Sequence, residues 1–120
     1  MSKIYYIYFL TNQSNRVLYI GMTSSIIHRL FEHKNHLLEG FTDRYNCTKL
    51  VYLERYADVN QAIKRENQLK AWSRKKKNFL IEKTNPNYED LSEGWGISIL
   101  DPKERLDYKK NLEKHNKNKV

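Results

Sequence analysis

The fold of this chain is decided by the stretch KIYYIYFLTNQSNRVLYIG, residues 3–21. Its two ends are rich in aromatic and β-branched residues, and a polar segment at residues 11–15 separates them. Such a pattern predicts a β-hairpin with strands at residues 3–10 and 16–21. Because side chains alternate between the two faces of a strand, Tyr8 and Tyr19 can share one face of this hairpin.

Two kinds of element are expected after the hairpin. Apolar residues recur at spacings of three and four from Ile26 to Leu38, behind the N-cap candidates at residues 23–25, which predicts an amphipathic helix. A basic, aromatic loop at residues 40–46 then leads to a third strand at residues 48–56, and Cys47 is expected as a small strand residue. Asp58 and Ser73 are N-caps of two further helices, so the predicted order is β-β-α-β-α-α.

The composition favours a single basic domain. The 120 residues are enough for one compact domain, and the net charge of +8 attracts polyanions. Residues 1–85 carry all of this excess, with 15 basic and 7 acidic side chains, whereas residues 86–120 carry 7 of each. Nucleic acid is therefore the leading candidate partner, and a solubilising surface is the alternative.

The cysteine content and the hydropathy of the sequence predict the cellular compartment of the protein. The single Cys47 excludes an internal disulfide and a Cys-rich zinc site, which indicates a reducing compartment. No apolar run approaches the roughly 18 residues that span a bilayer, and the first residues lack a signal-peptide layout. We expect a cytoplasmic protein with no membrane partner.

Glu66 is the most unusual residue of the predicted helix after Asp58. The residues Val59, Ala62, Ile63 and Leu69 form the expected apolar stripe of this helix, and Glu66 projects into its middle. A carboxylate is costly there unless it pairs with a cation or binds a metal. Periodicity leaves two alternatives equally open: an internal salt bridge to an arginine, or a functional role.

The last predicted helix of the domain opens with a basic run, Arg74 to Lys77. Cations at a helix start oppose the helix macrodipole, which suggests that the run serves an external anion, although a solvated lysine face is the alternative. The pattern weakens after Pro86. We expect a domain at residues 1–85 and a C-terminal extension at residues 86–120, formed by a turn around Gly94 to Gly96 and a polar tail that is partly helical or disordered.

Several spacings together resemble the GIY-YIG nuclease superfamily. Tyr6-Ile7-Tyr8 stands where that family has GIY, and Tyr19-Ile20-Gly21 stands where it has YIG. Residues 70–75 (KAWSRK) are similar to the small single-domain bacterial members, which are related to the catalytic domain of excision-repair nucleases. Tyr6 replaces the family glycine, and Met22 stands where excision-repair relatives carry a lysine. The resemblance covers residues 3–85 and implies an α+β fold with a small three-stranded antiparallel sheet flanked by helices.

The resemblance also implies a set of site residues. Glu66 would be the only protein ligand of a Mg²⁺ or Mn²⁺ ion, and Arg29 would bind the non-bridging phosphate oxygens. A tyrosine would deprotonate the attacking water, and family mechanisms differ on whether this is Tyr8 or Tyr19. His33 would relay or accept a proton, four residues after Arg29. The amide of Asn78, 12 positions after Glu66, would orient the phosphate or a neighbouring side chain.

The expected activity is metal-dependent endonucleolytic hydrolysis of DNA phosphodiester bonds. It would be selective for structures such as nicks, flaps, branches or single strands, in DNA repair or recombination. The expected backbone contacts come from a basic set, Lys70, Arg74, Lys75, Lys76 and Lys77. The alternative is a non-catalytic DNA- or RNA-binding module, in which Tyr8 and Tyr19 are ordinary strand aromatics. For Trp72 we expect a core anchor between helices in preference to a base-stacking residue.

Overall fold

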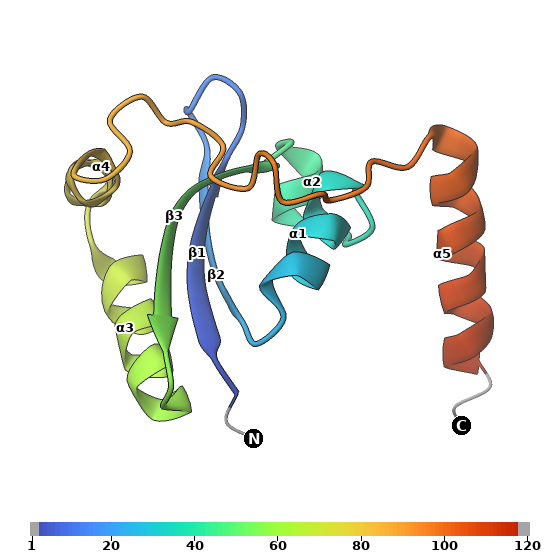
Figure 1. Ribbon diagram of the computed structural model, residues 1–120, viewed down its shortest axis with the longest axis horizontal. Helices are drawn as coiled ribbons and strands as arrows, with labels where there is room; N and C mark the ends of the chain where they lie inside the picture. Colours follow the sequence, from blue (N-terminus) through green and yellow to red (C-terminus); the bar gives the residue numbers. More distant parts are fainter. Residues whose placement is uncertain (1–2, 118–120) are drawn as a thin grey trace.

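Three strands form one antiparallel sheet in the order β2-β1-β3, as the computed structural model of residues 3–117 shows (Figure 1). The strands are β1 (Tyr5–Thr11), β2 (Leu18–Thr23) and β3 (Lys49–Tyr56). In the central strand, Tyr8 is opposite Gly21 of β2 and Leu53 of β3. The expected hairpin, third strand and α+β class are confirmed. The position of Cys47 is a correction, since it is buried two residues before β3 begins.

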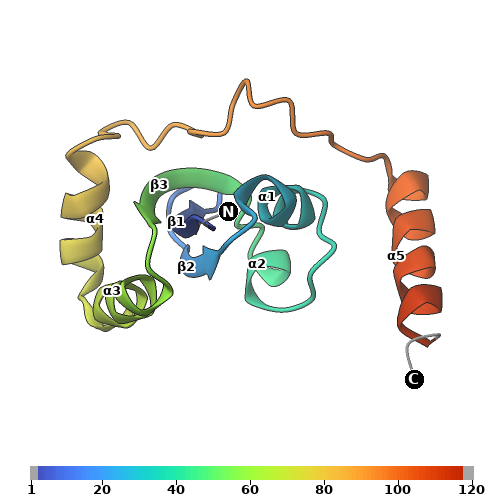
Figure 2. The ribbon, with the colours of Figure 1, turned by 60° about the horizontal axis from the view of Figure 1, so that its bottom comes forward.

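Helices cover both faces of this sheet (Figure 2). The first face carries α1 (Ile26–Lys34) and the short α2 (Phe41–Arg44), while α3 (Val59–Ala71) and α4 (Arg74–Glu82) cover the other. Asp58 and Ser73 cap α3 and α4 as predicted, because their side chains accept hydrogen bonds from backbone N–H groups two and three residues later. The sequence placed the end of the first helix too late and missed α2 inside the predicted loop.

The sheet separates two apolar clusters. One lies under α3 and α4, and Trp72 packs against its edge, as expected for an anchor between helices. The other lies under α1 and contains the buried Tyr8, with Tyr19 packed against it. The buried members of the first are Ile7, Phe9, Ile20, Val51, Leu69 and Ile81, and those of the second are Tyr8, Leu10, Ile26, Leu30, Cys47 and Leu50.

Residues 85–101 form an extended strap that crosses one end of the sheet between α4 and α5 (Pro102–Lys117) (Figure 1). The backbone N–H of Leu91 donates to Leu50 O at 2.7 Å, and Asp90 forms an ion pair with Lys34 at 2.6 Å. The fully buried Asn35 holds the distal part of the strap, because it donates to Ser98 O and accepts from Leu100 N. The first part of the predicted extension is thus bonded to the domain.

The described part of the polar tail that follows the strap is helical. It forms α5, which stands beside the domain in both views (Figures 1 and 2). An edge-on contact between the rings of Tyr108 and Phe31, with centroids 5.7 Å apart, connects α5 to α1. None of the helices within residues 3–117 has both the length and the apolar character that crossing a bilayer requires.

Candidate active site

Tyr8 and Tyr19 meet on the face of the sheet that α1 covers. Their ring centroids are 6.1 Å apart, with an angle of 44° between the ring planes. Gly21 lies directly opposite Tyr8 in the sheet, and a Cβ atom at this position would be only 2.5 Å from Cζ and Oη of Tyr8. Glycine is therefore required here for space, because any side chain would push into the tyrosine pair.

His33 completes a cluster of three rings. Its ring centroid is 5.7 Å from that of each tyrosine, and only 4% of the residue is exposed. Nε2 of His33 lies 3.1 Å from Oη of Tyr8, and Nδ1 lies 2.9 Å from Oγ1 of Thr42. Both contacts are hydrogen bonds, so one continuous chain of bonds runs from Tyr8 through His33 to Thr42 on α2. Sequence analysis missed Thr42, since nothing in its spacing to His33 marks it.

The protonation states of this cluster are set by burial and by Arg29. Burial raises the pKa of the Tyr8 hydroxyl, the neighbouring Tyr19 raises it further, and the guanidinium of Arg29 only partly opposes both. Burial also lowers the pKa of His33 to about 4, and the positive charge of Arg29 acts in the same direction. At neutral pH, Tyr8 therefore keeps its proton and His33 is neutral.

Arg29 lies at the margin of the ring cluster, on α1, with 38% of its side chain exposed. Its Nε is 3.3 Å from Oε1 of Glu32, yet this buried nitrogen has no hydrogen-bond partner within the described residues. The exposed part of the guanidinium, and not the buried Nε, is what an external acceptor could reach. A planar, permanently charged group of this kind matches the oxygens of a phosphate.

Glu66 approaches the sheet from the opposite face, on α3. The buried line of α3 consists of Ala62, Arg65, Glu66 and Leu69, and Arg65 binds Glu54 of β3 at 3.0 Å. Arg65 and Glu66 flank this line on opposite sides of the helix, and α3 as a whole contacts β2 as well as β1 and β3. Its side chain is 18% exposed, and its ion-pair partner is the exposed Lys70 at 3.6 Å.

The predicted α3 stripe is wrong in two of its members, and the structure also bears on the salt-bridge alternative that the sequence leaves open for Glu66. Val59 and Ile63 are 36% and 41% exposed, so Glu66 lies at one edge of the buried line and not at the middle of an apolar stripe. The internal salt bridge of α3 is made by Arg65 and Glu54, whereas Glu66 pairs with a lysine of its own helix. The stripe was misjudged because Arg65 and Glu66 are both half-buried. Arg65 can be half-buried because its charge is paired with Glu54 of β3.

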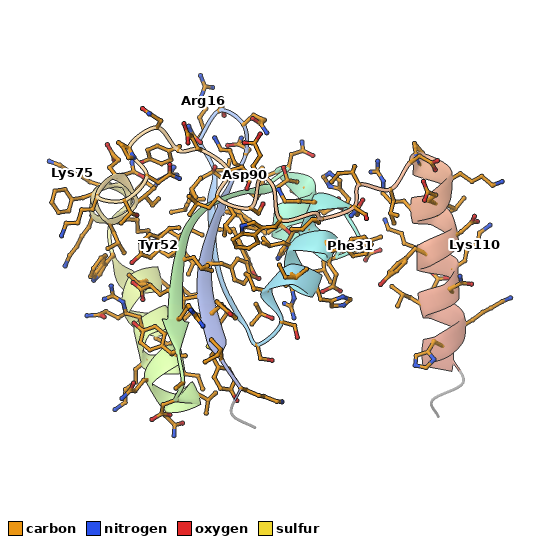
Figure 3. All side chains as sticks on the ribbon, viewed as in Figure 1. Arg16, Phe31, Tyr52, Lys75, Asp90 and Lys110 are labelled. Carbon is orange, nitrogen blue, oxygen red and sulfur yellow. The ribbon has the colours of Figure 1, made fainter. Side chains whose placement is uncertain are left out.

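Asn78 forms its side-chain hydrogen bond with Arg74 and not with a residue of the tyrosine cluster. Its Oδ1 accepts a hydrogen bond from Nε of Arg74 at 2.9 Å, and Arg74 also donates to the backbone carbonyls of Asn15 and Arg16. Arg74 thus fastens α4 to the turn between β1 and β2, where Arg16 marks the tip (Figure 3). In the structure Asn78 orients Arg74, and a role toward a substrate phosphate stays a prediction.

The rest of the basic set has mixed surroundings. Lys76 lies over the ring of Trp72 with Nζ 4.2 Å from its centroid, and Lys77 donates to the carbonyl of Lys70 at the end of α3. Lys75 projects from the outer side of α4 (Figure 3) and forms no ion pair within residues 3–117. The run is therefore partly structural, with Lys75 the member most available to an anion.

Among these residues, the carboxylate of Glu66 is the group that could bind a divalent metal ion. Within the part of the chain that the structure describes, no three His, Cys, Asp or Glu side chains cluster as a ligand set. Glu66 offers a single, partly exposed carboxylate whose partner is a surface lysine. One carboxylate completed by waters and a substrate oxygen suits a hard ion such as Mg²⁺.

The sequence of this region matches a known family. Residues 4–78 match the profile described as the GIY-YIG catalytic domain. The chain belongs to the GIY-YIG family. As this family is of the nuclease type, the general activity is that of a hydrolase and the general substrate class is nucleic acid. The expected family and its fold are confirmed.

Similar proteins are small members of the GIY-YIG family. A UPF0213 protein of Syntrophus aciditrophicus is 39% identical over 87 residues, which cover 72% of this chain and 97% of the relative. A UPF0213 protein of Natronomonas pharaonis is 31% identical over 81 residues, which cover 68% of this chain and 94% of the relative. The NMR structure of a UPF0213 protein from Bacillus halodurans is 23% identical, with a TM-score of 0.48 over 76% of this chain and 97% of that chain.

Proposed function

We propose that this GIY-YIG protein is a divalent-metal-dependent endonuclease that hydrolyses DNA phosphodiester bonds. We further propose that it selects DNA by structure and acts in repair or recombination. The observation that carries the proposal is the convergence of Tyr8, Tyr19, His33 and Arg29 in one cluster. β2 is an edge strand, so a DNA backbone lying along its free edge would have the tyrosines on one side and Glu66 on the other.

The two tyrosines have different access to an attacking water. Tyr8 is completely buried and bonded to His33, whereas Tyr19 is only partly buried. A general base must come within hydrogen-bond reach of the proton that it removes, which favours Tyr19 as the base. Arg29 places a positive charge beside this cluster. Tyr8 acts as a positioning residue that fixes the ring of Tyr19 and the imidazole of His33.

Arg29 would bind the scissile phosphate. Its side chain is 38% exposed while its buried Nε stays beside Glu32, so the exposed part of the guanidinium could donate to a non-bridging oxygen. In-line attack of water then forms the new P–O bond while the P–O3′ bond breaks. Tyr19 in its deprotonated form takes the proton of the water, and the departing 3′ oxygen takes a proton from solvent. Arg29 stabilises the negative charge that develops on the phosphate oxygens.

Glu66 would hold the Mg²⁺ or Mn²⁺ ion. When bound, such an ion supplies charge neutralisation at the phosphate and at the departing 3′ oxygen. The carboxylate of Glu66 has to leave Lys70 for this purpose, which is a small cost because Lys70 is half exposed and such surface pairs contribute about 0–1 kcal/mol.

The decisive experiment compares Glu66→Gln with the wild-type protein. Cleavage of nicked, flapped, branched, single-stranded and fully paired DNA is measured in Mg²⁺, in Mn²⁺ and in EDTA at low salt. Glu66→Gln should cut at least about 100-fold more slowly and still bind DNA, whereas the matched control Glu113→Gln on α5 should cut normally. Tyr19→Phe should lower kcat more than Tyr8→Phe, because only Tyr19 contacts the water.

Two results would overturn the proposal. If Glu66→Gln cuts as fast as the wild type, the metal assignment is wrong. If the wild-type protein binds nucleic acid with a steep salt dependence but cuts none of the DNA substrates in either metal, it is a binding module and not a nuclease.

A further inference from the structure

A pair of exposed aromatic rings stands next to the tyrosine cluster. Phe41 and Tyr45 are 47% and 42% exposed, and their centroids are 4.8 Å apart. The ring of Phe41 also stacks on Tyr19, with centroids 6.2 Å apart and an angle of 29° between the planes. We call Phe41 and Tyr45 the α2 platform. It continues the aromatic surface of the candidate active site outward to solvent.

The α2 platform is held rigidly. Gly40 enters α2 with a φ of 128°, a backbone conformation that favours glycine. Thr42, between the two aromatic positions, is 6% exposed, bonds to His33 and accepts from the N–H of Cys47 at 2.9 Å. Tyr45 N–H in turn donates to Phe41 O at 3.0 Å. Rings on so short and fixed an element lose little conformational entropy when a ligand packs on them.

The charges around the α2 platform suit a polyanion. A hollow of about 520 Å³ is lined by Gly40, Phe41, Asp43, Arg44 and Tyr45. Asp43 is already bonded to His36, with 3.0 Å between Oδ1 and Nδ1. Arg44 is exposed and forms no ion pair within the described residues, so it supplies the free charge beside the rings.

We propose that the α2 platform is a subsite for an unpaired nucleobase of the DNA substrate. Every base has a flat π-face, so stacking on aromatic rings is tolerant of sequence, and a neighbouring arginine adds backbone and cation–π contacts. Bases inside an intact duplex are stacked on each other and do not present this face. The inference rests on the proposed DNA substrate and adds its class: DNA with at least one unpaired nucleotide beside the cleaved bond.

The test measures binding without cleavage. A fluorescent single-stranded oligonucleotide and a fully paired duplex of the same length are titrated in EDTA with wild type, Phe41→Leu, Phe41→Trp and Phe79→Leu. Phe41→Leu keeps an apolar side chain but removes the π-face, so single-strand affinity should fall roughly 5- to 100-fold, while duplex affinity changes by less than about twofold. Phe41→Trp should retain affinity. A 2-aminopurine in the oligonucleotide should be quenched by the wild type and not by Phe41→Leu.

Phe79→Leu is the matched control, because Phe79 is 63% exposed but lies on α4 across the sheet, under the cation of Lys83. The inference is overturned if Phe41→Leu binds the single strand as well as the wild type does, or if Phe79→Leu loses as much. An RNA of the same sequence that depends on Phe41 more strongly than DNA does would overturn the choice of DNA. The titration in EDTA measures binding independently of cleavage. If binding depends on Phe41 but the wild-type protein cuts no DNA substrate in Mg²⁺ or Mn²⁺, the nuclease is rejected and the subsite is kept.

Discussion

Replacing Gly21 by alanine tests whether the tyrosine pair has the geometry described above. The added Cβ would lie 2.5 Å from Cζ and Oη of Tyr8 and 2.8 Å from Cε2 of Tyr19. Ordinary contacts begin at 3.4 Å, so the Tyr8 ring must retreat by 3.4 − 2.5 = 0.9 Å and the Tyr19 ring by 3.4 − 2.8 = 0.6 Å. Tyr8 has no free space, since it is completely buried and bonded to His33.

The expected cost follows from these displacements. Overpacking of this kind destabilises a core by about 1–3 kcal/mol. Misplacing reactive groups by about 1 Å lowers turnover by roughly 100-fold. Glycine in a strand interior is itself unfavourable by roughly 0.5–1 kcal/mol relative to alanine, so a loss of stability must come from the clash.

A double-mutant cycle with Tyr8→Leu makes this test specific. Free energies of unfolding come from urea titration, and turnover comes from single-turnover cleavage. Because leucine has no ring opposite residue 21, Gly21→Ala should cost at least about 1 kcal/mol less in the Tyr8→Leu background than in the wild type. Additive effects, or a Gly21→Ala protein with wild-type stability and turnover, would refute the proposed contact.

Three further predictions concern the lowered pKa of His33, the hydrogen bonds of Arg74 and the exposed Lys75. The pKa of His33 is lowered from 6.5 to about 4, so between these pH values the unfolded chain binds more protons than the folded protein does. The contribution of the neutral His33 to the free energy of unfolding is therefore fully present above pH 6.5 and is lost as the pH falls toward 4. Wild type should lose about 2 kcal/mol more than His33→Gln between pH 7 and pH 5 in urea titrations, and equal slopes would contradict the buried neutral imidazole. Arg74→Ala should lose about 1–3 kcal/mol of stability, because it removes bonds to Asn78 and to the carbonyls of Asn15 and Arg16. Lys75→Ala should change stability by less than about 0.5 kcal/mol and reduce the salt slope of DNA binding by about one, and the reverse pattern would show that Arg74 is the residue free to bind DNA.

Local sequence patterns were sufficient for the three strands, for most of α1, α3 and α4, and for part of the candidate site. Two-residue alternation placed Tyr8 and Tyr19 on one face, and antiparallel pairing brought them together. One helical turn between Arg29 and His33 put both side chains near that pair. The caps Asp58 and Ser73 were recognised because a capping side chain bonds to the backbone two or three residues away.

Contacts between distant segments could not be predicted in this way. The site depends on Gly21 facing Tyr8 and on Thr42 reaching His33, and both follow from strand register and from the path of the chain after α1. The basic run looked free in the sequence, yet Arg74 reaches back 58 and 59 residues to the β1–β2 turn.

The sequence by itself determined the order of the three strands and of α1, α3 and α4, the faces of the two tyrosines and the family of the protein. Only the tertiary structure decided that Glu66 lies at one edge of the buried line of α3 beside Lys70, that Asn78 bonds to Arg74, and that a four-residue helix places Phe41 on Tyr19. Periodicity states which side of an element is buried. The partner that buries it is fixed by how the elements pack together, and that information is spread over the whole chain.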